Sequence, residues 1–188
     1  CRDMVNEPVC HMNSQVFASQ TIDLLKNSGA RVEVLNKAKI AAYRMNGLLA
    51  VNRGSADPPA FLIMEWKPPH PVNHKPLVLV GKGLLYDTGG INIKTSAHME
   101  NMKNDMAGGA AVVSALYAVA RTKLPVHVVG LVPLTDNRPA GNALVSGDII
   151  EYSDGTTVEV LNSDAEGRLI LADGMIFAKK FHPSLVIT

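Results

Sequence analysis

Short apolar runs alternate along this chain with longer segments in which apolar residues recur every three or four positions. The short runs predict buried strands, which we expect at residues 32–35, 48–51, 61–64, 77–81, 126–132 and 185–188. The longer segments predict helices, which we expect at residues 14–29, 36–47, 105–122 and 166–181. Because strands and helices alternate, we predict an α/β fold with a mixed, largely parallel central sheet flanked by helices.

The connections between these elements carry turn and loop signals. Ser14 is placed to cap the first helix, and Asp154-Gly155 is typical of a tight turn in a hairpin over residues 148–161. The Pro-rich segment 67–76 predicts an exposed loop, and the Gly-rich segment 82–90 predicts another loop directly after a strand. The second loop bears on function, because open α/β sheets bind ligands at the carboxyl ends of their strands.

The composition is that of a well-buried globular domain. Hydrophobic residues make up 47% of the 188 residues and charged residues 19%, which fits a single domain and argues against disorder. The net charge of +1 and the scattered Lys and Arg residues argue against a nucleic-acid partner. No apolar run approaches the roughly 20 residues that a membrane span needs, and no segment resembles a signal peptide. We therefore expect neither nucleic acid nor membrane as a partner.

Both ends of the chain suggest further expectations. Cys1 and Cys10 lie too close together in sequence to staple a domain of this size. We expect them to be unpaired thiols, which is typical of a reducing compartment and predicts a cytoplasmic location. The chain starts at Cys1 and stops at Thr188 inside an apparent strand. We therefore expect residues 1–188 to be a piece of a longer protein.

Three stretches place charged side chains next to apolar runs, where charge is unexpected. They read "GKGLLYDTGGINIK", "MKNDMAGGAA" and "NSDAEGR". Their charged residues are Lys82, Asp87, Lys94, Lys103, Asp105, Asp164, Glu166 and Arg168. Two of the stretches directly follow predicted strands, so the fold argument lets the loops converge on one crevice.

Four carboxylates in one crevice repel each other unless cations lie among them. A pair of divalent ions would neutralise them, and carboxylate oxygens suit Mg²⁺, Mn²⁺ and Zn²⁺. Two metal ions about 3.5–4 Å apart form a common centre for hydrolysis. Lys94 and Arg168 would then be free to face a substrate oxyanion or a bound anion.

Taken singly, these signals keep other interpretations open. The Gly-rich stretch could cradle a phosphate or a nucleotide, although its spacing matches neither established phosphate-binding fingerprint. Asp105 and Glu166 could be acidic residues of first helical turns, and Asp164 could be an N-cap. His70 and His74 have the spacing of helical metal ligands, but the prolines around them forbid a helix. It is the joint occurrence of the charges that favours a metal centre.

The same three stretches resemble the leucyl aminopeptidase, or cytosol aminopeptidase, family. They stand here as "VGKGLLYDTGG", "MKNDMAGGAA" and "NSDAEGRLILAD". The family signature N-T-D-A-E-G-R-L appears as "NSDAEGRL", with Ser163 in place of Thr. The likeness covers the whole chain. It departs from the usual family pattern at Leu85, Tyr86 and Thr88, which stand where the family usually has Thr, Phe and Ser.

The resemblance implies a role for each candidate residue. The first metal would have the ligands Lys82 (as a neutral amine), Asp87, Asp105 and Glu166, and the second would have Asp87, Asp164 and Glu166. Arg168 would hold a bicarbonate ion that acts as general base, and Lys94 would polarise the scissile carbonyl. Met102 would form a wall of the pocket for the first side chain, and Asn162 would lie near the substrate.

The resemblance also implies an activity and an assembly. The protein would be a dinuclear metallo-aminopeptidase that hydrolyses the N-terminal peptide bond of peptides, prefers a leucine-like first residue and uses a metal-bridging water. Its ions would be Zn²⁺ or Mn²⁺, with Mg²⁺ or Co²⁺ as alternatives, and family members form hexamers. Residues 1–188 would be the N-terminal portion of a zinc-peptidase-like catalytic domain. The family's N-terminal domain and the rest of the catalytic domain would lie outside this chain.

Two alternatives from other functional classes stay open at this point. The chain could be a catalytically inert fragment or an assembly module with the same fold. It could also be an α/β domain that binds a phosphate or a nucleotide through the Gly-rich stretch.

Overall fold

Six strands form the central sheet of the computed structural model, which describes residues 1–188. The strand order is β1, β2, β5, β3, β8, and β4 also pairs with β5. The strands span Arg31–Leu35 (β1), Ala60–Trp66 (β2), Leu77–Val80 (β3), Gly83–Asp87 (β4), Val128–Asn137 (β5) and Leu185–Ile187 (β8). β2 is antiparallel to β1 and β5, whereas β3 and β4 run parallel to β5, and β8 runs parallel to β3. The prediction of a mixed, largely parallel central sheet is confirmed.

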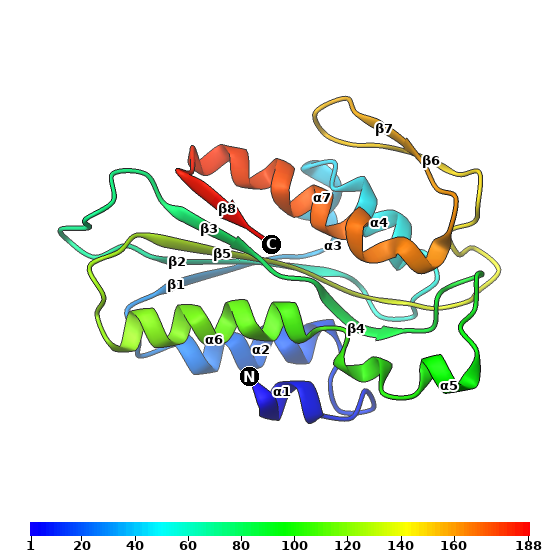
Figure 1. The fold of residues 1–188 in the computed structure, drawn as a ribbon, viewed down its shortest axis with the longest axis horizontal. Helices are drawn as coiled ribbons and strands as arrows, with labels where there is room; N and C mark the ends of the chain where they lie inside the picture. The colour runs from blue at the N-terminus through cyan, green and yellow to red at the C-terminus, as the bar shows by residue number, and fades with distance from the viewer.

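Helices cover both faces of this sheet (Figure 1). One face carries α1 (Arg2–Asn6), α2 (Ser14–Leu25) and α6 (Ala107–Arg121), and the other carries α3 (Lys37–Ala42), α4 (Asn46–Asn52) and α7 (Glu166–Ala178). The shorter elements are α5 (Ser96–Met99), the hairpin strands β6 (Ile149–Glu151) and β7 (Thr157–Glu159), and the 3₁₀ turns η1 (Met102–Asn104), η2 (Ser163–Ala165) and η3 (Lys179–Phe181). Figure 1 shows β4 and the N-terminal end of α7 at the same end of the molecule.

Two hydrophobic cores hold the helices to the sheet, one on each face. The strand β2, which lies between β1 and β5, contributes to both, because successive side chains of a strand point to opposite faces. Phe61 belongs to the core beneath α4 and α7, and Leu62 and Met64 belong to the core beneath α2 and α6. All three are fully buried, and burial of such a side chain contributes about 1.5–3 kcal/mol.

Residues 36–51 differ from the prediction of one helix followed by a strand. Asn36 caps α3 as expected, accepting a hydrogen bond from Lys39 N at 3.0 Å. The chain then turns at Arg44, whose φ is +53°, and residues 48–51 form part of α4 instead of a strand. Periodicity cannot separate a four-residue strand from one turn of a buried helix. The predicted cap of α2 is also wrong by one residue, since Asn13 and not Ser14 accepts its first N–H groups.

The segment predicted as a Gly-rich loop contains a strand. Residues 83–87 form β4, which pairs with the far end of β5 with a register shift between Leu84 and Asp87. β5 itself runs to Asn137, beyond the predicted end at residue 132. The two extensions bring Asp87 opposite Asn137 in the sheet. Asp87 and Asn137 are both buried, so the sheet contains a pair of buried polar residues that the sequence did not predict.

The remaining connections agree with the prediction. The β6–β7 hairpin turns at Gly155, whose φ is +86°, and Tyr152 N donates to Thr156 O at 2.8 Å. Residues 67–76 form a loop that is mostly exposed. No helix has both the length and the apolar character needed to cross a membrane.

A buried carboxylate joins α7 to α4. Asp173 is 2% exposed, and its Oδ2 accepts a hydrogen bond of 2.7 Å from Leu48 N in the first turn of α4. Burial raises the pKa of Asp173 to about 7, although the backbone donors of Leu48 and Gly47 work against this shift. The folded protein therefore holds a proton on Asp173 at pH values where the unfolded chain has released it.

Replacing Asp173 with Asn should change how stability depends on pH. The folded pKa lies above the unfolded one, so the contribution of Asp173 is fully present below about pH 4. It is lost as the pH rises to 7, at about 1.4 kcal/mol per pH unit. Urea unfolding measures the free energy of unfolding of Asp173→Asn and of wild type between pH 5 and 8. The variant should gain stability relative to wild type as the pH rises to 7, and the difference should then stay constant. The exposed Asp23→Asn is the control, and a difference for Asp173→Asn that stays constant across this range would contradict the argument.

Candidate metal centre

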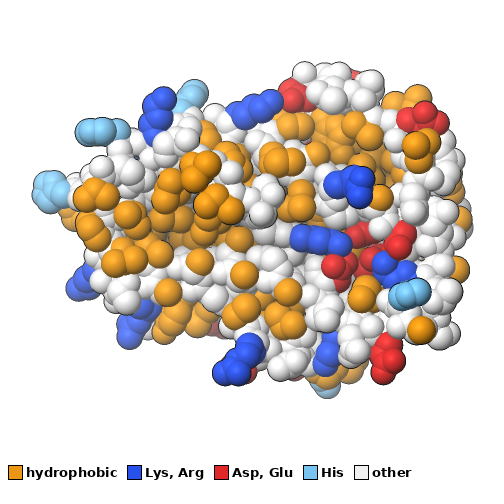
Figure 2. All heavy atoms as spheres, in the orientation of Figure 1, with side chains coloured by type: hydrophobic (Ala, Val, Ile, Leu, Met, Phe, Trp, Pro, Cys, Tyr) orange, Lys and Arg blue, Asp and Glu red, His pale blue; other side chains and the backbone are white.

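The three charged stretches meet beside β4, at the end of the molecule where β4 and β5 give way to loops. Figure 2 shows acidic and basic side chains side by side in the right half of the view, while further Lys, Arg and His side chains are scattered along the margins. The stretch after β3 supplies Lys82, the end of β4 supplies Asp87, and the segment before α6 supplies Asp105. The turn η2 and the start of α7 supply Asp164 and Glu166.

Lys82 joins two of these stretches. Its Nζ lies 2.7 Å from Asp105 Oδ2 and 2.9 Å from Glu166 Oε1. The lysine side chain reaches both carboxylates because Gly167 has no side chain. A Cβ at that position would lie 2.7 Å from Lys82 Cε and 2.8 Å from its Nζ. The glycine of "DAEGR" is therefore part of the geometry of the centre.

Lys94 joins the other two carboxylates. Its Nζ lies 2.8 Å from Asp87 Oδ2 and is also ion-paired with Asp164 Oδ1. Asp87, Asp164 and Glu166 each offer an oxygen, and these oxygens lie within 4.8 Å of one another. Each lysine thus forms ion pairs with two carboxylates that come from different segments of the chain.

Burial makes these charges interact strongly. Glu166 is 1% exposed and Asp87 2%, and charge interactions strengthen as the local dielectric falls. Desolvation raises the pKa of Glu166 and of Asp105, against the opposing effect of Lys82. Desolvation lowers the pKa of Lys82, but the charges of Glu166 and Asp105 outweigh it, so the net pKa is raised.

The donor set fits a cation. Asp105 Oδ2 is buried, and its partner is the Lys82 ammonium at 2.7 Å. Three oxygens from Asp87, Asp164 and Glu166 already converge. Buried carboxylates of this kind are stabilised by coordination as well as by ammonium groups.

The structure gives three further residues, Asn137, Ser163 and Asn92, contacts in the centre that the sequence did not predict. Asn137 Nδ2 contacts Asp87 Oδ1 at 2.9 Å and Glu166 Oε2 at 3.3 Å. Ser163, which is fully buried, donates from Oγ to Gly89 O at 2.7 Å, and its N–H donates to Asn92 Oδ1 at 2.8 Å. Asn137 had one usable signal, since a polar residue at the end of a long apolar strand is unusual. The contacts of Asn92 and Ser163 had no such signal, because the two residues and their partners are distant in sequence.

The other predicted residues lie around this core. Arg168 is exposed and pairs with none of the carboxylates that Lys82 and Lys94 hold. It lines a groove of about 460 Å³ between α7 and the β6–β7 hairpin. Asn162 Oδ1 accepts from Asp164 N at 2.8 Å and so caps η2, while Met102 is half-buried in η1. Lys103 lies outside the centre, since its Nζ donates to Asn6 O at 2.5 Å.

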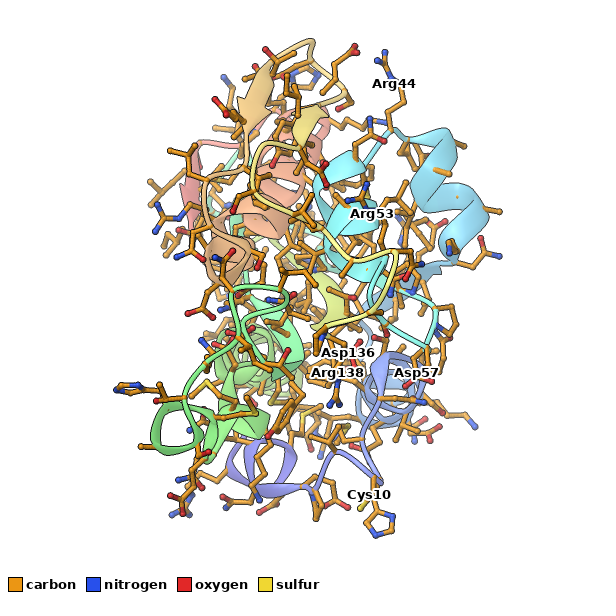
Figure 3. The ribbon with its side chains drawn as sticks, turned by 90° about the vertical axis from the view of Figure 1, so that its right-hand side faces the viewer. Cys10, Arg44, Arg53, Asp57, Asp136 and Arg138 are labelled. Atoms are coloured by element: carbon orange, nitrogen blue, oxygen red, sulfur yellow. The ribbon has the colours of Figure 1, made fainter.

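Tyr86, the residue before Asp87, has a partner directly after β5. Arg138 places its guanidinium 4.6 Å from the centre of the Tyr86 ring, and its Nε donates to Asp136 Oδ2 at 2.7 Å. Figure 3 shows Asp136 and Arg138 together near Asp57, with Arg53 and Arg44 further up the same side. This stacking on Tyr86 supports β4 directly before Asp87.

The whole chain matches a known family. Residues 1–188 match the model of the cytosol aminopeptidase family, catalytic domain. A probable cytosol aminopeptidase of Chlorobaculum parvum is 49% identical over 187 residues, which are 99% of this chain and 37% of that relative.

Solved structures give the same result. The bottromycin maturation enzyme BotP in complex with Mn is 40% identical with a TM-score of 0.92, and the match covers 98% of this chain and 40% of that one. A leucine aminopeptidase of Caenorhabditis elegans is 30% identical with a TM-score of 0.91, over 97% of this chain and 37% of that one. The chain spans little more than a third of the length of the curated relatives it matches, about 37%. All of its residues match the catalytic domain of the cytosol aminopeptidase family, and the chain belongs to that family.

Proposed function

We propose that this chain carries the metal ligands of a dinuclear aminopeptidase that hydrolyses the N-terminal peptide bond of peptides, preferring an apolar first residue. The observation that carries the proposal is the convergence of Asp87, Asp164 and Glu166, whose oxygens lie within 4.8 Å of one another. Family membership supports it, because the matching relatives are named as aminopeptidases. The Mn-bound relative supports a metal-dependent activity.

Two overlapping sets of residues are proposed as ligands. The first set is Lys82, Asp87, Asp105 and Glu166, and the second is Asp87, Asp164 and Glu166. Asp105 Oδ2 supports a cation at the first position, because it is buried and already faces the positive charge of Lys82. Carboxylate and amine ligands suit Mn²⁺ and Zn²⁺, with Mg²⁺ and Co²⁺ as alternatives. Divalent ions held there would polarise a carbonyl group and acidify a water molecule.

The two remaining cations are proposed to act on the reacting groups. Lys94 would donate a hydrogen bond from Nζ to the scissile carbonyl oxygen, where negative charge develops. Its contacts with Asp87 and Asp164 support this role, since they keep the ammonium beside the ligands. Arg168 would hold a bicarbonate ion, which accepts a proton from the attacking water. Its exposed guanidinium, unpaired with the centre's carboxylates, supports anion binding.

Specificity is proposed to come from the rim of the centre. Met102 would form one wall of the pocket for the first side chain, and Asn162 would contact the substrate backbone. Their positions support this, because Met102 lies in η1 just before Asp105 and Asn162 caps the turn that carries Asp164. Recognition of a free α-amine by the acidic centre would restrict cleavage to the first residue.

The larger context is also a proposal. Residues 1–188 would form the N-terminal portion of the catalytic domain, and the whole protein would assemble into a hexamer and act in the cytoplasm. The length of the relatives supports the first point, because the chain covers only 37% of them. Two free, exposed cysteines support a reducing compartment.

Metal titration tests the ligand sets directly. The metal-stripped chain should bind Mn²⁺ at two sites per chain in calorimetry. The double variant Asp164→Asn, Glu166→Gln should lose both metal sites, because Asp164 belongs to the second ligand set and Glu166 belongs to both sets. Asp154→Asn is a matched control, since Asp154 pairs with Lys179 away from the centre. A folded wild-type chain that binds no Mn²⁺ would favour an inert fragment or a phosphate-binding domain.

Lys94→Met should lower kcat for leucine p-nitroanilide by about 10²–10³, with little change in KM, because the lost contact matters most as charge develops on the oxygen. Metal content must be measured alongside, since the variant leaves Asp87 and Asp164 without their ammonium partner. Lys103→Met removes a lysine outside the centre and should retain activity. N-acetyl-leucine p-nitroanilide should resist cleavage by every form, and its hydrolysis would argue against an aminopeptidase.

Arg168→Ala should abolish any stimulation of the wild-type rate by added bicarbonate, with an overall loss of about 10²–10⁴ if the anion acts as general base. Lys179→Ala is the comparison, because Lys179 lines the same groove but pairs with Asp154. Initial rates at rising bicarbonate concentration give the answer. Equal bicarbonate responses in both variants would remove Arg168 from this role.

A further inference from the structure

One amide group touches three of the chain segments that build the centre. Asn137 Nδ2, at the end of β5, lies 2.9 Å from Asp87 Oδ1 on β4 and 3.3 Å from Glu166 Oε2 on α7. The same nitrogen lies 3.0 Å from Ser163 O in η2. All three neighbours are acceptors, and an amide NH₂ group has two protons to donate. The environment therefore fixes which end of the Asn137 side chain faces the centre.

The Asn137 amide donates to one oxygen of Asp87 and one oxygen of Glu166, and it does not contact the second oxygen of either carboxylate. Asp87 Oδ2 faces Lys94 at 2.8 Å, and Glu166 Oε1 faces Lys82 at 2.9 Å. Binding one oxygen of a carboxylate fixes the rotation of the group and so the direction of its second oxygen. Gly89 N also donates to Asp87 Oδ1 at 2.9 Å, but Asn137 is the group that contacts both carboxylates and so orients them relative to each other.

The surroundings hold Asn137 in this position. Its side chain is buried, with the residue 3% exposed, and its backbone O accepts from Thr88 N at 3.0 Å and from Thr88 Oγ1 at 2.8 Å. Gly90 adopts a φ of +67°, and a Cβ there would lie 2.7 Å from Asn137 Oδ1. The amide is thus enclosed on the side away from the carboxylates as well as tied to them.

We infer that Asn137 is a positioning residue of the metal centre, which directs one oxygen each from Asp87 and Glu166 towards the ions. This inference rests on the proposed function, in which these two carboxylates are shared by both ligand sets. A neutral amide suits the position, because it donates to two carboxylates without adding charge that would compete with the ions. Groups that orient metal ligands in this way typically change metal affinity by about 10–100-fold when removed.

The chain offers a matched control for the loss of a buried amide. Asn52 is also 3% exposed, and its Nδ2 donates to Asp57 O at 2.8 Å and to Thr135 Oγ1 at 3.1 Å. None of these partners belongs to the centre. Asn52→Ala therefore removes a similar buried amide while leaving the carboxylates untouched.

The experiment compares Asn137→Ala, Asn137→Ser and Asn52→Ala with wild type, all as metal-stripped 188-residue chains. Thermal unfolding should show lower midpoints for all three variants, because each loses buried hydrogen bonds. Mn²⁺ titration by calorimetry should show about 10–100-fold weaker binding in the Asn137 variants alone. The visible absorption of bound Co²⁺ should change in the Asn137 variants and match wild type in Asn52→Ala. Asn137→Ser decides the result if Asn137→Ala does not fold.

Affinity and Co²⁺ absorption equal to wild type in a folded Asn137 variant would overturn the inference. Equal weakening in Asn52→Ala would also overturn it, since the effect would then follow from lost stability. A wild-type chain that binds no Mn²⁺ would overturn the proposed function and this inference with it. That outcome differs from the others, because they require a wild type that binds metal.

Discussion

Repulsion between buried carboxylates is the constraint on which the rest of this structure depends. Asp87 and Glu166 are nearly inaccessible to water, and Asp105 and Asp164 lie within reach of the same two lysines. A group of negative charges in a poorly solvated place is unfavourable unless each charge has a partner. The lysines and the Asn137 amide provide these partners. The sheet makes such pairing possible, because it places the β3–β4 link, which carries Lys82, and the ends of β4 and β5 in succession along one ladder.

The sheet does this through the pairing of β5 with two consecutive strands. β3 pairs with its first half and β4 with its second half, so the chain continues along β5 through Gly81 and Lys82. Asp87 and Asn137 then face each other at the end of the same ladder. On the other side, η2 and α7 approach from above the sheet and contribute Asp164 and Glu166. Hydrogen bonds between Asn92 and Ser163 hold the loop after β4 against η2.

The sequence predicted much of this architecture and of the charged centre. Apolar runs located β2, β3 and β5 because each is buried, and the "NSDAEGR" stretch identified the acidic end of α7. Residues 48–51 were misassigned, since a short apolar run suits a buried helix as well as a strand. β4 was missed because a strand with glycines and an Asp lacks the usual pattern, and only pairing with β5 makes it one. The roles of Asn92, Asn137 and Ser163 depend on contacts between distant segments, which no local pattern encodes.

Gly167 has a consequence for any attempt to graft this centre onto another scaffold. The stem of Lys82 crosses the bare backbone at that glycine, so even one added methyl group would collide with the amine. The lysine side chain is flexible enough to move aside, but it would then leave Asp105 and Glu166. A transplant that copied every charged residue and omitted the glycine would fold with all its charges present and its amine displaced. Empty space at one position is as much a component of this centre as any carboxylate.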